Sequence, residues 1–177
     1  MTLTDRIKLT VRDVEGYPRP GIVFKDITPI LADAILMNDI VNEMACRYKN
    51  MGIDVVAAIE ARGFIFGSVL ANKLGCSFVP VRKAGKLPFH TRKESYKLEY
   101  GSAEIEVHTD AFKPGNRVLI HDDLLATGGT ATAAGKLVRS FDAEVAGFSF
   151  LINLGFLPGE ENLAKEFRLS PDFLIKY

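Results

Sequence analysis

Apolar residues recur at helical spacing near the start of the chain and then give way to short, nearly continuous apolar runs. Over residues 33–49 the apolar positions fall three or four residues apart, which predicts an amphipathic helix ending before Gly52. These positions are Leu36, Met37, Ile40, Val41, Met44, Ala45 and Tyr48. The run at 53–59 (IDVVAAI) is typical of a strand buried on both faces of a parallel sheet. A second helix near Gly63–Leu74 and a strand at 77–81 continue the pattern.

The pattern changes in the middle of the chain, where apolar and charged residues alternate. The apolar positions are Tyr96, Leu98, Tyr100, Ile105 and Val107, with the Gly101-Ser102 pair between the two groups. Such alternation around a two-residue Gly-X turn predicts a β-hairpin. A strand at 118–121, a helix at 130–141 and a strand at 145–152 follow. Strands that alternate with helices predict an α/β fold with a parallel sheet.

The chain shows no repeat, low-complexity tract or linker. Its Pro- and Gly-rich stretch at 16–21 lies too near the N-terminus to separate two domains. A length of 177 residues corresponds to about one domain. We therefore expect residues 1–177 to form a single domain, with the hairpin as an excursion from its sheet.

Charge and composition argue against several classes of partner. Lys and Arg together number 22, as do Asp and Glu, so no overall field would hold the chain on a polyanion or an anionic membrane. We expect no nucleic-acid and no membrane partner. Cys46 and Cys76 lack the spacing of a zinc site or a redox pair and are expected to be reduced thiols. The charged N-terminal segment and the lack of a long apolar run predict a cytoplasmic protein.

Residues 118–130 read VLIHDDLLATGGT, a strand that runs into a glycine-rich loop before a helix. Ligands of open α/β sheets bind beyond the carboxyl ends of strands, where we expect a loop at 122–130. Gly128 and Gly129 let backbone amides turn inward, while Thr127 and Thr130 add hydroxyl donors near the positive end of the helix. The loop is neither a Walker A sequence nor a GxGxxG sequence. It predicts a site for a phosphate dianion.

Two adjacent carboxylates, Asp122 and Asp123, stand at the predicted end of this strand. They can accept hydrogen bonds from the diol of a ribose. Taken separately, an acid pair and a Gly-Gly turn are usually a solvated strand end and an ordinary turn. In register after one strand, they predict a site for a phosphorylated ribose.

The segment 118–130 resembles the phosphoribosyl-diphosphate (PRPP) motif of the type I phosphoribosyltransferases. The resemblance implies the fold of that family: a central parallel sheet flanked by helices, with a small hood and a flexible β-hairpin lid. It also implies which residues bind the ribose phosphate of PRPP. They are Asp122, Asp123, Leu124, Leu125, Ala126, Thr127, Gly128, Gly129 and Thr130.

Four further segments resemble the adenine-using members of this family. They read PGIVFKDITPIL (20–31), EARGFIFG (60–67), VRKAGKLP (81–88) and YKLEYG (96–101). Members that use 6-oxopurines typically carry Asp at the position of Ala126, facing N7 of the base, so guanine and hypoxanthine are less suitable substrates. The resemblance implies an enzyme that joins adenine to PRPP and gives AMP and diphosphate in purine salvage.

The resemblance also assigns the contacts with adenine. Backbone groups around Val23, Phe24 and Lys25 would read the edge of the base, with Phe24 on one face of the ring and Leu154 on the other. Lys25 stands where many relatives carry Arg, and the exchange should be mild if recognition uses peptide groups. Taken alone, Phe24 and Leu154 would be ordinary core residues.

Basic residues stand on two predicted turns and could neutralise a leaving pyrophosphate. They are Arg62 on the first turn and Arg82, Lys83 and Lys86 on the second. The alternative is a solvated basic loop. By resemblance, Glu60 and Ala61 form the turn beside pyrophosphate, and Arg82 reaches the neighbouring site of a homodimer. Mg²⁺ is expected, because it commonly binds through substrate phosphates and waters with few protein ligands.

On the predicted hairpin, Glu99 matches the family acid that contacts N7 of adenine and helps to manage the N9 proton. Tyr100 would close over the substrates, and the alternation puts it on the opposite face of the strand from Glu99. Glu99 and Arg62 are the catalytic candidates. Residues 84–95 are expected to form a mobile lid. His121 stands where relatives carry an apolar residue, and we expect a hydrogen-bonded strand histidine there rather than a catalytic or metal-binding one.

Two other functions use the same motifs. One is a PRPP-binding regulator of transcription or RNA, although the chain lacks a helix-turn-helix extension and a basic surplus. The other is a phosphoribosyltransferase for another base, such as xanthine.

Overall fold

A computed structural model describes residues 1–97 and 101–177, and the chain divides into two compact units, Met1–Cys46 and Arg47–Tyr177. The N-terminal unit contains short elements followed by the start of a long helix. They are α1 (Leu3–Thr10), β1 (Arg12–Glu15), β2 (Val23–Asp26), α2 (Thr28–Leu31) and α3 (Ala34–Tyr48). β1 and β2 form an antiparallel pair. The helix predicted at 33–49 is confirmed as α3.

Side-chain caps start two helices of this unit. Thr2 Oγ1 accepts a hydrogen bond from the amide of Asp5 at 3.1 Å, and Asp5 Oδ2 accepts one from the amide of Thr2 at 2.9 Å, which forms a capping box for α1. Asp33 Oδ1 accepts a hydrogen bond from the amide of Leu36 at 2.9 Å at the start of α3. The elements before α3 were not predicted, because they are too short to show a sustained hydrophobic period.

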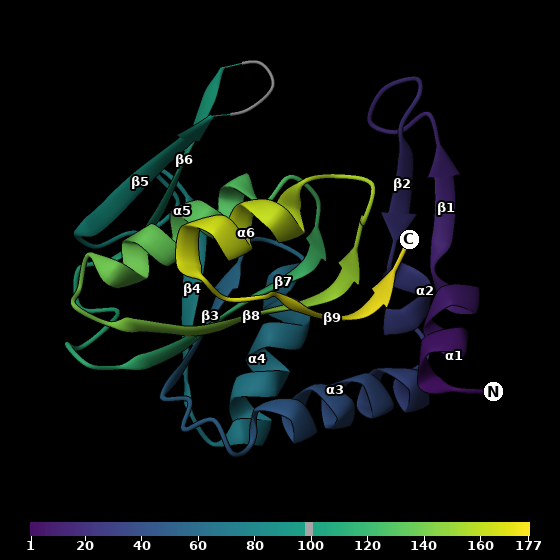
Figure 1. The fold of residues 1–177 in the computed structure, drawn as a ribbon, viewed down its shortest axis with the longest axis horizontal. Coiled ribbons are helices and arrows are strands. Elements are labelled where there is room, and N and C mark those ends of the chain that lie inside the picture. The colour runs from purple at the N-terminus through teal and green to yellow at the C-terminus, as the bar shows by residue number, and fades with distance from the viewer. Residues whose placement is uncertain (98–100) are drawn as a thin grey trace. The chain divides into compact units, whose positions relative to one another are not determined.

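A seven-stranded sheet organises the C-terminal unit, in the order β5-β6-β4-β3-β7-β8-β9 (Figure 1). Its strands are β3 (Val55–Ile59), β4 (Ser77–Lys83), β5 (Thr91–Lys97), β6 (Ser102–His108), β7 (Arg117–Leu125), β8 (Glu144–Asn153) and β9 (Asp172–Lys176). β4, β3, β7, β8 and β9 run parallel, whereas the β5-β6 hairpin joins β4 in antiparallel fashion. The predicted α/β fold with a central parallel sheet is confirmed, with an antiparallel extension at one edge.

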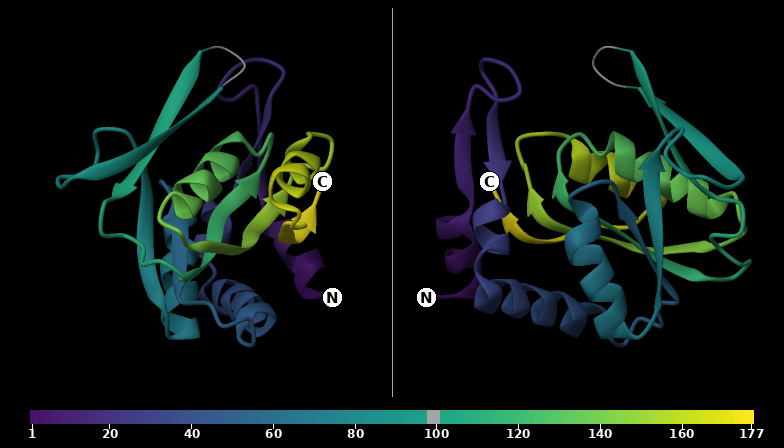
Figure 2. Two further views of the ribbon diagram at one scale, coloured as in Figure 1. Left: turned by 60° about the vertical axis from the view of Figure 1, so that its left-hand side comes forward. Right: turned by 180° about the vertical axis from the view of Figure 1, so that it is seen from behind.

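Helices cover both faces of this sheet. α4 (Gly63–Leu74) lies on one face, and α5 (Gly129–Arg139) and α6 (Gly159–Phe167) lie on the other (Figures 1 and 2). α4 has the predicted bounds, whereas α5 begins and ends slightly earlier than the predicted 130–141. α6 and β9 were not predicted from the sequence.

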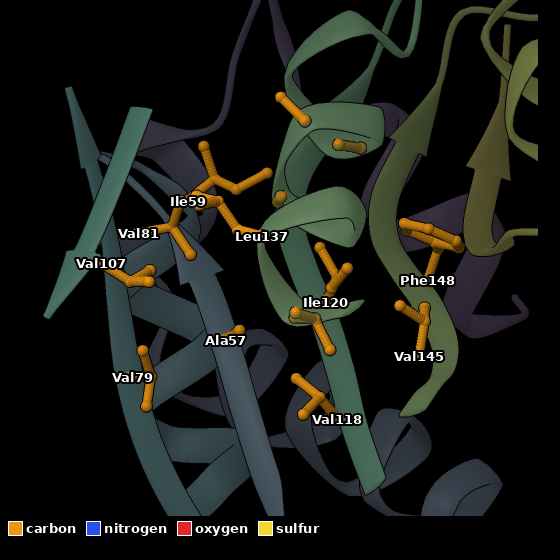
Figure 3. Packing of buried hydrophobic residues seen from close by; sticks show 14 of the residues in the cluster. Ala57, Ile59, Val79, Val81, Val107, Val118, Ile120, Leu137, Val145 and Phe148 are labelled. Carbon is orange, nitrogen blue, oxygen red and sulfur yellow. The ribbon is translucent and has the colours of Figure 1, made fainter. Parts of the chain in front are cut away.

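One large hydrophobic cluster lies between the sheet and α5. Ile59 of β3 and Ile120 of β7 belong to one buried cluster with Leu137 of α5 (Figure 3). Successive strand residues point to opposite faces, so Ala58, next to Ile59, faces α4. There Gly67 allows close approach, because a Cβ at Gly67 would lie 2.5 Å from Cβ of Ala58. The same strands therefore pack against helices on both faces, and this packing fixes the carboxyl ends of the strands.

The hairpin differs from its prediction in register. Lys97 pairs with Ser102, so the connection is not the predicted two-residue turn at Gly101 and Ser102. β5 begins at Thr91, inside the segment 84–95 that was expected to be a lid. Alternation of apolar and charged residues indicates a hairpin, but it does not specify which residue of β5 pairs with which residue of β6.

Candidate active site

β7 and α5 place the predicted phosphate loop at the carboxyl edge of the parallel strands. β7 continues past its predicted end at His121 to Leu125, because its main chain stays paired with β8 as far as Asn153. On its other side β3 pairs with β7 only as far as His121. The acid pair therefore lies within the strand, at a position where one of the strand's neighbours has already ended. The connection to α5 is 126–128, shorter than the predicted 122–130.

This connection and its two flanks enclose a hollow of about 90 Å³. Gly128, the residue before α5, has φ +81°, in the left-handed region that favours glycine. The amides of the first turn of a helix have no intrahelical acceptor, and in α5 no side chain at Gly128 caps them either. Exposed amides and the positive end of a helix dipole stabilise an anion. The hollow can hold a phosphate group.

The two acids at the end of β7 are largely removed from water. The side chain of Asp123 is 5% exposed, and its Oδ2 lies 2.8 Å from Nε of Arg62. The amide of Asp123 donates to Oδ1 of Asp122 at 2.8 Å. Burial raises the pKa of Asp122 well above its ordinary value, and the neighbouring Asp123 raises it further. Burial also raises the pKa of Asp123, against the opposite effect of Arg62. Desolvated acceptors of this kind are suited to the hydroxyls of a sugar.

Glu60 joins the end of β3 to the end of β4, because Arg82 and Lys83 lie within β4 and not on the predicted basic turn, which contains Lys86. Its Oε2 accepts hydrogen bonds from Nε of Arg82 at 2.9 Å and from the amide of Lys83 at 3.0 Å. Burial raises the pKa of Glu60, but these hydrogen bonds lower it more, and the net shift is downward. Nη1 of Arg82 also donates to the carbonyl of Lys86 at 3.0 Å. The peptide bond between Glu60 and Ala61 is cis. Arg82 is thus paired within its own chain.

A second hollow, of about 130 Å³, connects the two groups of candidate residues. Glu60 and Lys83 line it from the ends of β3 and β4, and Asp122 and Thr130 line it from β7 and α5. Positions distant in sequence meet here because the parallel strands end at one edge of the sheet. An elongated polyanionic ligand could lie across both hollows.

Glu106 supports the basic turn and was not among the predicted site residues. It is 1% exposed, and its Oε1 accepts hydrogen bonds from the amides of Lys86 and Leu87, both at 2.9 Å. Its Oε2 accepts one from the hydroxyl of Thr91 at 3.1 Å. Burial raises the pKa of Glu106, but the hydrogen bonds outweigh this effect and lower it. The alternating sequence predicted a polar position between Ile105 and Val107, and nothing in that pattern shows that a turn folds over the acid.

The candidates for binding the base lie in both units. Those of the N-terminal unit are Val23, Phe24 and Lys25 on β2. Nζ of Lys25 lies 2.7 Å from Oδ1 of Asp13. Leu154 of the C-terminal unit follows β8 directly and is half-buried, and its amide donates to the carbonyl of Leu125 at 2.9 Å. Leu154 is therefore tied to the last residue of β7.

Two candidates on the hairpin, Glu99 and Tyr100, lie outside the described residues. His121 is fully buried, and its Nδ1 lies 3.3 Å from Oγ of Ser149. Burial lowers the pKa of His121 to about 4, so the imidazole is neutral near pH 7. The expected hydrogen-bonded strand histidine is confirmed.

Among residues 1–97 and 101–177, no group of three or more His, Cys, Asp or Glu is placed to hold a metal ion.

No helix in the described part of the chain is both long and apolar enough to cross a membrane.

Known proteins have sequences similar to this chain. Residues 30–166 match the model of the phosphoribosyl transferase domain family. An adenine phosphoribosyltransferase from Rhodopirellula baltica is 56% identical over 154 residues, which is 87% of this chain and 75% of the relative.

Solved structures extend the comparison to the whole fold. A crystal structure of adenine phosphoribosyltransferase from Thermoanaerobacter pseudethanolicus has a TM-score of 0.94 at 46% identity, covering 99% of this chain and 100% of that chain. The Saccharomyces cerevisiae enzyme, complexed with D-2,5-dideoxy-2,5-imino-altritol 1,6-bisphosphate and adenine, has a TM-score of 0.89 at 36% identity, covering 98% of each chain. The chain therefore belongs to the phosphoribosyltransferase family, among the adenine phosphoribosyltransferases.

Proposed function

We propose that this protein transfers the phosphoribosyl group of PRPP to N9 of adenine, forming AMP and releasing diphosphate in purine salvage. The observation that carries the proposal is the continuity of the site. Asp122 and Thr130 line the same hollow as Glu60 and Lys83. A PRPP molecule placed there has its ribose at the acid pair, its 5′-phosphate toward 126–130 and its diphosphate toward Glu60 and Lys83.

The ribose phosphate is bound by residues 122–130. The carboxylates of Asp122 and Asp123 accept hydrogen bonds from the ribose hydroxyls, and the amides at the start of α5 donate to the 5′-phosphate. Thr127 and Thr130 add hydroxyl donors. The small hollow enclosed by this segment supports the assignment, because it exposes the first-turn amides of a helix without a side-chain cap.

The diphosphate leaves toward the cationic groups at the ends of β3 and β4. Arg62 directly follows Glu60 and Ala61, and its ion pair with Asp123 links the ribose to the leaving group. Arg82, Lys83 and Lys86 add positive charge. The carboxylates of Glu60 and Asp122 at the hollow are the protein oxygens that would help to hold Mg²⁺, and a bound Mg²⁺ would add positive charge against the diphosphate. Fixed cations stabilise the charge that develops as the bond to C1 breaks.

The family resemblance assigns adenine to Phe24 and Leu154, with backbone groups of Val23 and Lys25 at its edge, and this assignment stays a prediction. The yeast relative solved with adenine supports this choice of base. Ala126 supports adenine too, because family members that use 6-oxopurines typically carry Asp at this position. Glu99 and Tyr100 lie outside the described residues, and the roles that the resemblance implies for them, handling the N9 proton and covering the substrates, stay predictions. The bond between N9 and C1 forms as the bond between C1 and diphosphate breaks.

The assembly is a further part of the proposal. We infer that both compact units act as one phosphoribosyltransferase domain and that the protein is a homodimer. In the dimer, Arg82 would leave its ion pair with Glu60 and reach into the active site of the neighbouring subunit. A cytoplasmic location stays a prediction from composition.

The test is an assay of purified protein with PRPP, Mg²⁺ and one nucleobase at a time. We expect AMP from adenine, little product from guanine or hypoxanthine, and no turnover after EDTA removes Mg²⁺. Product from xanthine or orotate in place of adenine would overturn the substrate assignment, and no product with any base would overturn the transfer reaction. Asp123→Asn should lose PRPP turnover, whereas Glu144→Gln, a change at an exposed ion pair with Arg117, serves as the matched control.

A further inference from the structure

Helix α6 packs against the side of the phosphate loop that faces away from the proposed ligand. Nδ2 of Asn162 donates to the carbonyl of Thr127 at 2.9 Å. Backbones also meet closely, because a Cβ at Gly159 would lie 2.3 Å from the carbonyl oxygen of Ala126. A Cβ at Gly128 would lie 3.1 Å from the carbonyl oxygen of Gly159. The start of α6 therefore contacts each residue of the connection 126–128.

α6 is itself held firmly. At its N-terminal end, Oε2 of Glu160 accepts hydrogen bonds from Nδ2 of Asn153 and from Nζ of Lys176, both at 2.8 Å. At its C-terminal end the ring of Phe167 lies against α5, where a Cβ at Gly135 would be 2.3 Å from Cζ of that ring. The helix is thus fixed to β8, β9 and α5 before it contacts the phosphate loop. It can act as a rigid support.

The hydrogen bond from Asn162 determines which way one peptide group of the loop points. In a trans peptide the C=O and the following N–H point in opposite directions. The carbonyl of Thr127 points to Asn162 on α6, so the N–H of Gly128 points away from α6, toward the hollow that Gly128 lines. If this peptide rotated, a carbonyl oxygen would face the phosphate instead of an N–H donor.

We infer that Asn162 is a positioning residue for the 5′-phosphate of PRPP. It does not contact the substrate, but it orients the Thr127-Gly128 peptide so that the Gly128 amide can donate to the phosphate. This inference rests on the proposed function. It adds a residue from α6, which lies outside the PRPP motif. It also explains why the loop and α6 meet at two glycines, Gly128 and Gly159.

The experiment compares Asn162→Ala with Glu161→Gln, an exposed neighbour on the same helix. Calorimetry gives the dissociation constant of ribose 5-phosphate, and steady-state kinetics give KM for PRPP and for adenine. For Asn162→Ala we expect the dissociation constant and the KM for PRPP to rise about 3- to 10-fold, the usual effect of one oriented hydrogen bond. The KM for adenine and the melting temperature should stay close to wild type. Glu161→Gln should match wild type in every measurement.

Three outcomes are informative. Ribose 5-phosphate binding and KM for PRPP unchanged in Asn162→Ala would overturn the inference. An equal rise in KM for adenine and PRPP, with a lower melting temperature, would also overturn it, because that pattern indicates general loosening. Wild-type protein that fails to bind ribose 5-phosphate would overturn the proposed function itself.

Discussion

Replacing Arg62 with Gln removes the positive charge beside a carboxylate that has little access to water. The side chain of Asp123 is 5% exposed and that of Arg62 is 33% exposed, with 2.8 Å between Nε and Oδ2. Breaking a fully buried pair costs about 3–5 kcal/mol, whereas an exposed pair contributes about 0–1 kcal/mol. Because Arg62 is partly solvated, we expect Arg62→Gln to lower the free energy of unfolding by about 1–3 kcal/mol. For a chain of this size a loss of about 2 kcal/mol corresponds to a melting temperature lower by roughly 4–8 °C.

The assay is a double-mutant cycle with Arg62→Gln, Asp123→Asn and the combination, measured by urea unfolding. The cycle isolates the part of the cost that comes from the unpaired acid, because the amide side chain at position 123 of the double variant carries no charge. A second cycle on Arg117 and Glu144, whose side chains are 39% and 56% exposed, serves as the control and should give a coupling near zero.

The sign of the pH dependence follows from the raised pKa of Asp123. A carboxyl group whose pKa is raised by folding makes the folded protein lose stability as pH rises from its ordinary value, near 3.9, through the raised value. Without Arg62 that pKa should rise further. The stability difference between wild type and Arg62→Gln should therefore be small near pH 4 and grow toward pH 8. A coupling below about 0.5 kcal/mol, or a difference that does not depend on pH, would refute this reasoning.

Three further predictions concern the site and the packing that holds it. Asp122→Asn should raise the melting temperature of the ligand-free protein at neutral pH, because the pKa of Asp122 is raised by burial and by Asp123, while ribose 5-phosphate binds at least about tenfold more weakly. Unchanged ribose 5-phosphate binding in calorimetry would contradict this placement of the ribose. Glu99→Gln should lower kcat with adenine, and wild-type turnover in the same assay would remove Glu99 from catalysis. Gly67→Ala should lower the free energy of unfolding by about 1–3 kcal/mol, because the new Cβ would lie 2.5 Å from Cβ of Ala58, and urea unfolding without such a loss would show that α4 can shift.

Local patterns predicted the elements whose burial is regular. α3, β3, α4 and β8 were found within a few residues of their bounds, since their apolar periods extend over a helix or a whole buried strand. The elements α1, β1, β2, α2, α6 and β9 were missed, because they are short and their stability comes from neighbours rather than from a pattern of their own. The end of β7 was placed too early for a different reason. Its acid pair looks like a strand end, but pairing with β8 carries the strand to Leu125.

The sequence by itself determined the chemistry that is concentrated in one segment: a strand, an acid pair and a glycine loop, all within 118–130. Only the tertiary structure decided which distant residues serve that segment. The partner of Asp123 is Arg62, the partner of Glu60 is Arg82, and Asn162 holds Thr127. Hydrophobic periods record which face of an element is buried, but not which side chain from another element completes its hydrogen bonds. That choice is made when parallel strands bring their carboxyl ends to one edge and the helices close around them.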